Sequence, residues 1–202
     1  MNEQFWWYLT RSSGIVAWLM LTASVIWGVV LSTRAFPEQR RPAWLLGLHR
    51  WLGGLAVSFL AIHLAALVAD SYIEFGIADL TIPFASEWKP GAVALGVVAF
   101  WLLVAIEVTS LAKRRLSRRV WRGIHFLSYA VFWLTSIHAA LAGTDRTQWL
   151  YQITAAASIA AVAWSLMYRL SNQRKARTAA PIDHEPSTRS KDALRPPARE
   201  LH

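Results

Sequence analysis

Four of the six histidines in this 202-residue chain lie inside long apolar stretches. His49 and His63 are 14 residues apart, and His125 and His138 are 13 residues apart. Imidazole is the commonest metal ligand among protein side chains, and an ionisable group inside an apolar span marks function by default. Two such histidines from facing helices at one level can act as the axial ligands of a haem iron. A haem site is therefore the first chemistry that these residues predict.

The chain contains no cysteine. This excludes a disulfide framework, thiolate zinc sites, iron–sulfur clusters, cysteine nucleophiles and covalently attached c-type haem. Imidazole ligands inside an apolar bundle suit b-type haem, which needs no covalent attachment. We expect two haems b and assign no catalytic residue.

The composition indicates what must hold these histidines. Apolar residues make up 55% of the chain and charged residues 16%, which is more apolar and less charged than a soluble globular domain. The net charge is +9, but the basic residues lie between and after the apolar blocks. This distribution is typical of a membrane protein and argues against nucleic acid as a partner.

Five stretches are long enough to span a bilayer, which needs about 20 apolar residues. Alanine and leucine dominate them and no alternation of period two is present, so they are predicted as helices. The fold class is therefore an all-α membrane protein, a polytopic bundle of five transmembrane helices. We expect a short outer segment at 1–11, a haem-binding domain at 12–170 and a disordered basic tail at 171–202. The spans are 12–33, 44–69, 91–112, 120–142 and 149–168.

Basic residues in the short loops predict the orientation, because they gather on the cytoplasmic side. The loop after the third span, 113–119, holds five basic residues and no acidic one. The loop after the first span holds Arg34, Arg40 and Arg41. The N-terminus is therefore expected outside and the C-terminus in the cytoplasm, in a multi-pass protein of the cell membrane.

The second and fourth spans run in the same direction, so their histidines are expected at two shared depths. His49 and His125 would hold an inner haem iron near the cytoplasmic face, and His63 and His138 an outer haem iron. The two levels are roughly 20 Å apart along the helix axis. Thirteen residues leave His138 about 140° around an ideal helix from His125, so the fourth span must tilt or depart from regular winding.

Other residues have supporting or minor roles in this prediction. Glu107 is interpreted as a polar group near the cytoplasmic end of the third span, and His184 and His202 in the tail are assigned no role. The candidate partners for haem propionates are Arg50, Arg122, Lys89 and Arg146. The small residues that would leave room for flat porphyrins are Gly53, Gly54, Ala61, Ala65, Ser128, Ala139 and Ala140.

The motifs around these histidines resemble the ferric-reductase-like transmembrane domain family over roughly residues 10–170. The likeness rests on Leu-His-Arg-Trp-Leu-Gly at 48–53, Thr-Ser at 109–110, the segment 118–129 and the 14/13 histidine spacing. This family includes the membrane halves of NADPH oxidases and the haem-binding subunit of the bacterial methionine-sulfoxide reductase system. The resemblance implies two b haems stacked across the membrane on the four histidines named above.

Full reductases of this family continue into a flavin and NADPH domain, whereas this sequence shows no glycine-rich dinucleotide fingerprint. We therefore expect an electron-transfer subunit of an oxidoreductase, embedded in membrane lipid. Its donor would be a separate flavoprotein or a quinol, and its external acceptor a reductase subunit, ferric iron or oxygen. A bound flavin or quinone is a further cofactor left open.

Two alternatives accompany this expectation. One is a di-haem anchor of a dehydrogenase that reduces quinone. The other is a haem-free transporter or metal permease that uses the intramembrane histidines as ligands.

Overall fold

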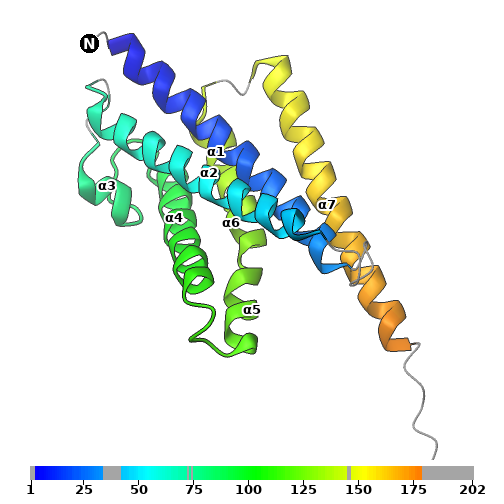
Figure 1. The fold of residues 1–202 in the computed structure, drawn as a ribbon. Helices are drawn as coiled ribbons and strands as arrows, with labels where there is room; N and C mark the ends of the chain where they lie inside the picture. The colour runs from blue at the N-terminus through cyan, green and yellow to red at the C-terminus, as the bar shows by residue number, and fades with distance from the viewer. Residues whose placement is uncertain (1–2, 34–41, 72, 74, 145–146, 179–202) are drawn as a thin grey trace, which may run out of the picture.

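The computed structural model describes residues 3–33, 42–71, 73, 75–144 and 147–178, and these contain helices and connecting turns without a strand. Five helical stretches among them are long and apolar enough to cross a membrane, which confirms the predicted fold class. The helices are α1 (Glu3–Ser32), α2 (Ala43–Ala69), α3 (Ile77–Thr81), α4 (Pro90–Leu111), α5 (Arg118–Phe126), α6 (Ser128–Ala142) and α7 (Trp149–Thr178) (Figure 1).

Local sequence signals place several helix ends. Pro90 occupies the first turn of α4, where its missing N–H costs nothing. The Ser117 hydroxyl accepts a hydrogen bond from the Val120 N–H at 3.3 Å and so caps α5. Gly143 ends α6 in an extended conformation. These signals separate the spans without help from distant parts of the chain.

Two helices extend beyond the predicted spans. α1 begins at Glu3 rather than at residue 12, because the aromatic and aliphatic residues of 5–9 extend the apolar helix without a breaker. α7 continues to Thr178, into the segment 171–202 that was predicted as a tail. Gln, Arg, Lys and Ala in this stretch are strong helix formers, and polarity alone does not end a helix.

The fourth span is also not one continuous helix. It divides at Leu127 into α5 and α6, where the Leu127 N–H donates to the carbonyl of Ile124 at 3.0 Å. That bond spans three residues and tightens the winding locally. The departure from regular winding that the histidine spacing required is therefore present, two residues after His125.

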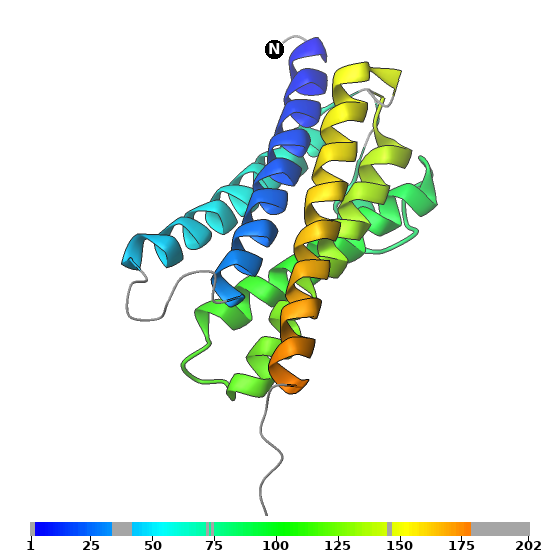
Figure 2. The same ribbon diagram turned by 90° about the vertical axis from the view of Figure 1, so that its right-hand side faces the viewer.

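α1 lies in the middle of the bundle, with α2 along one side and α7 along the other, while α4 pairs with α6 (Figure 2). The core cluster draws residues from all five spans. Trp18 of α1 stacks on Phe132 of α6 with ring centres 6.4 Å apart, and its indole N–H donates to the Ser136 hydroxyl at 3.0 Å. Among the remaining core residues are Ala56, Ala99, Ile106 and Val162.

Among the described residues, the backbone of α2 packs closely against that of α1. α2 and the α5–α6 pair are farther apart, and the imidazole rings of His49 and His125 lie in the space between them. This space is the part of the bundle to which the predicted ligands belong.

The connection between α2 and α4 folds back on the bundle. Phe75 and Trp88 meet edge to face at 6.0 Å and pack against Val93 and Val97 of α4. The Trp101 indole donates to the carbonyl of Thr81 in α3 at 2.8 Å.

The basic loop 113–119 and the C-terminal end of α7 lie at the same end of the bundle (Figure 1). The orientation relative to a membrane stays a prediction. Several residues used in the sequence analysis lie outside the described residues: Arg34, Arg40, Arg41, Arg146, His184 and His202.

Candidate functional site

The four intramembrane histidines meet in pairs between α2 and the α5–α6 segment. His49 of α2 and His125 of α5 have ring centres 6.0 Å apart, with the ring planes inclined at 76°. His63 of α2 and His138 of α6 lie close enough to interact electrostatically. The structure therefore brings together the two pairs expected from the direction of the spans.

Backbone carbonyls hold the rings of the second pair. Nδ1 of His63 lies 2.8 Å from the carbonyl oxygen of Thr10, and Nδ1 of His138 lies 2.7 Å from that of Ala92. A carbonyl oxygen accepts only, so each Nδ1 carries the proton and donates it. Each Nε2 is consequently a free lone pair, the form in which imidazole binds a metal.

Hydroxyl groups hold the rings of the first pair. Nδ1 of His49 is 3.3 Å from the Ser24 hydroxyl, and Nδ1 of His125 is 3.4 Å from the Ser110 hydroxyl. A hydroxyl donates or accepts, so these contacts orient the rings less strictly than the carbonyls do. All four histidines thus use Nδ1 for orientation, and no described residue hydrogen-bonds to any of the four Nε2 atoms.

Glycines face three of the four rings. A Cβ atom on Gly96 would lie 2.9 Å from His138, on Gly14 3.0 Å from His63, and on Gly28 3.4 Å from His49. Gly14 and Gly28 of α1 are 14 residues apart, as are the histidines of α2 that they face. These glycines let each imidazole lie against a neighbouring helix.

A family model for the ferric reductase like transmembrane component matches residues 13–136. The chain belongs to this family. Neither the curated proteins nor the solved structures contain a match. The match covers His49, His63 and His125 and ends two residues before His138. Family membership and the five apolar helices make the chain a multi-pass membrane protein and a membrane electron-transfer component.

The predicted propionate partners are only partly near this ferric-reductase-like site. The side chains of Arg50 and Arg122 are exposed on the surface of the bundle. Lys89 donates to the carbonyl of Leu141 at 3.1 Å and lies over the Trp88 ring. Its ammonium group therefore already has a partner at the C-terminal end of α6. Of the small residues named above, Gly53 faces Glu107, whose Oε1 would lie 3.4 Å from a Cβ at that position.

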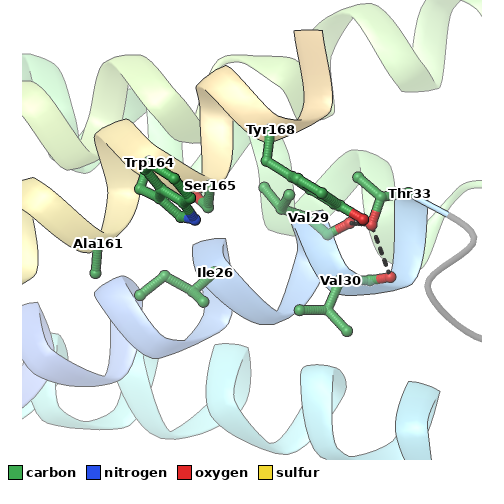
Figure 3. A pocket seen from close by; sticks show the side chains of 8 residues that line it. All are labelled: Ile26, Val29, Val30, Thr33, Ala161, Trp164, Ser165 and Tyr168. Atoms are coloured by element: carbon green, nitrogen blue, oxygen red, sulfur yellow. Dashed lines mark hydrogen bonds between the residues drawn. The ribbon is translucent and has the colours of Figure 1, made fainter. Parts of the chain in front are cut away.

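A cavity of about 360 Å³ lies elsewhere, between the C-terminal part of α1 and α7. Its walls are mainly apolar, and Figure 3 shows the Tyr168 ring reaching from α7 toward Thr33, which directly follows α1. None of the four histidines lines it. This cavity is therefore separate from the histidine pairs.

Sequence reasoning missed the groups that orient the rings. Thr10, Ser24 and Ala92 were not singled out, because neighbours across helices are not visible in a linear sequence. Ser110 entered solely through the family motif. One signal was available for the glycines, since the spacing of Gly14 and Gly28 repeats that of His49 and His63.

Proposed function

We propose that this ferric-reductase-like chain is a di-haem b-type cytochrome that passes single electrons across the membrane. His49 and His125 would hold the inner haem, and His63 and His138 the outer haem. The observation that carries the proposal is that all four imidazoles have Nδ1 hydrogen-bonded and leave Nε2 free, and that the rings of His49 and His125 lie side by side.

The spacing of the inner pair fits this cofactor. An imidazole nitrogen binds a transition metal at about 2 Å, and the ring centre lies about 1 Å behind the nitrogen, so two axial rings have centres about 6 Å apart. The observed separation of His49 and His125 is 6.0 Å. The wide separation of α2 from the α5–α6 segment also supports a planar ligand between them.

When bound, haem supplies a one-electron iron couple whose potential depends on its axial ligands and their surroundings. The residues of this chain orient the ligands and exclude water. Thr10 and Ala92 fix the proton of the outer pair on Nδ1 through their carbonyls. Core residues such as Trp18, Phe132 and Val162 provide an apolar surrounding for the bundle.

The electron donor would be a separate cytoplasmic flavoprotein or a quinol, and the acceptor would lie outside: a reductase subunit, ferric iron or oxygen. All five basic residues of 113–119 are exposed, next to the helix α5 that carries His125. Such a surface favours docking of an acidic flavoprotein. Mixing purified protein with a quinol or with a reduced flavoprotein, and following its visible spectrum, separates the two donors.

The decisive experiment is a dithionite-reduced minus oxidised visible spectrum of the detergent-purified protein, with haem quantified per chain. We expect two low-spin b haems. Replacing either member of a pair by alanine should remove about half of the absorbance, because each haem needs both axial ligands. His184→Ala and His202→Ala are the controls and should retain the full spectrum.

Two outcomes would overturn the proposal. One is colourless protein from cells grown with ample haem, which would favour a haem-free transporter. The other is full haem content in a variant that lacks all four intramembrane histidines.

A further inference from the structure

Arg169 of α7 is partly buried and lies against two aromatic rings. Its Nη1 donates to the Tyr129 hydroxyl at 3.0 Å. Its guanidinium carbon lies 5.1 Å from the ring centre of Phe126 and 5.9 Å from that of Tyr129. These contacts join α7 to both sides of the break between α5 and α6.

The arginine has more donors than these contacts use. A guanidinium carries five N–H groups in a planar fork, and one of them goes to Tyr129. Arg169 forms no salt bridge with the described residues, although it belongs to the candidate membrane span Trp149–Asn172. A charged side chain at such a position is costly unless it has a partner, so an anionic group is expected to complete this site.

The inner histidine pair is the neighbour that identifies the anion. Phe126, against whose ring the guanidinium lies, follows His125 directly in α5. Arg169 is therefore at the level of His49 and His125. It lies outside the residues that match the family model.

We propose that Arg169 binds a carboxylate, a propionate of the haem held by His49 and His125. This inference rests on the function proposed above. The fork of a guanidinium matches a carboxylate in a bidentate pair, and the aromatic rings of Phe126 and Tyr129 hold it in place by cation–π contact. An anionic lipid headgroup is the other source of the same oxygen chemistry, and the test separates the two.

The test is a redox titration of the full-length protein carrying Arg169→Gln. Removing the positive charge leaves the propionate uncompensated and disfavours the reduced haem. We expect about tenfold less reduced inner haem at a fixed potential, equal to a shift of about −59 mV for one electron, with the outer haem unchanged. Arg169→Lys keeps the charge but loses the fork and should restore part of the shift.

Reconstitution of protein from haem-starved cells with haem or haem dimethyl ester identifies the anion. If Arg169 binds a propionate, the ester and Arg169→Gln have non-additive effects, because they remove the same interaction. Additive effects would assign the arginine to a lipid and overturn the inference. Tyr129→Phe, which retains the arginine, should leave most of the potential intact; an equal shift would show a purely structural role.

Arg115→Gln, at an exposed loop position, is the control for a general loss of charge. Unchanged potentials of both haems in Arg169→Gln would reject the inference and leave the proposed function standing. Wild-type protein without haem would reject the proposed function itself.

Discussion

The imidazole of His138 lies directly against Gly96, so that a Cβ atom on the glycine would come within 2.9 Å of ring atoms Cε1 and Nδ1. One turn earlier on the same helix, the carbonyl of Ala92 accepts the Nδ1 proton of His138. α4 thus holds this ring by a hydrogen bond and by steric contact. The position of the ring depends on the absence of a side chain at residue 96.

Gly96→Ala is therefore expected to displace His138 and weaken the outer haem. The new methyl group meets a ring that the Ala92 hydrogen bond prevents from retreating freely. Haem per chain, measured as the pyridine haemochrome, should fall by up to about half, since one of two bis-histidine sites is affected. Gly91→Ala, on the same helix, is the matched control, because a Cβ there meets no atom within 4 Å. Full haem content in Gly96→Ala would show that the ring adjusts without cost.

Ser24→Ala and Ser110→Ala should affect the inner level alone. Each removes the hydroxyl beside the Nδ1 atom of one inner ligand, and loss of such an orienting group lowers metal affinity by about 10-fold or more. Haem retention during dialysis against apomyoglobin measures this, with the two haems distinguished by their potentials. Ser58→Ala is the control, because that exposed hydroxyl bonds to the Gly54 carbonyl in its own helix. Equal loss from both levels would contradict the assignment.

Ser136→Ala should destabilise the bundle without removing a ligand. The Trp18 side chain is 9% exposed, and its N–H would lose its acceptor. An unsatisfied buried donor costs about 1–3 kcal/mol. Thermal unfolding in detergent, followed by the haem absorbance, should show a lower midpoint than wild type. Thr154→Ala is the control and should unfold like wild type, because the Thr154 hydroxyl bonds to the Leu150 carbonyl at an exposed position. An unchanged midpoint for Ser136→Ala would show that the indole finds another acceptor.

The predicted orientation is testable with single cysteines, because the natural chain has none. Ile77→Cys is at a site 77% exposed in α3, and Arg115→Cys lies in the basic loop with four basic neighbours still present. An impermeant maleimide should label Ile77→Cys in right-side-out vesicles and Arg115→Cys in inside-out vesicles, as the distribution of basic residues requires. The reverse pattern would invert the topology and exchange the inner and outer haem levels.

The number of spans and the candidate ligands followed from sequence because both depend on neighbouring residues. A run of apolar side chains makes a helix stable across lipid, and the spacing of His49 and His63 sets their separation along one axis. Helix ends were less predictable: polar residues beyond 170 still favoured helix in α7, and the spacing of His125 and His138 allowed irregular winding in 120–142 without locating the break at Leu127.

The partners of the histidines were decided by the tertiary structure. Whether Ser24 meets His49, Gly96 meets His138 or Arg169 meets Tyr129 depends on how each helix is rotated and how it crosses its neighbours. Those rotations result from packing of the whole core, in which Trp18, Phe132 and Val162 come from three different helices. The linear sequence specifies the depth of a residue within its own helix, whereas the packed bundle specifies what lies beside it.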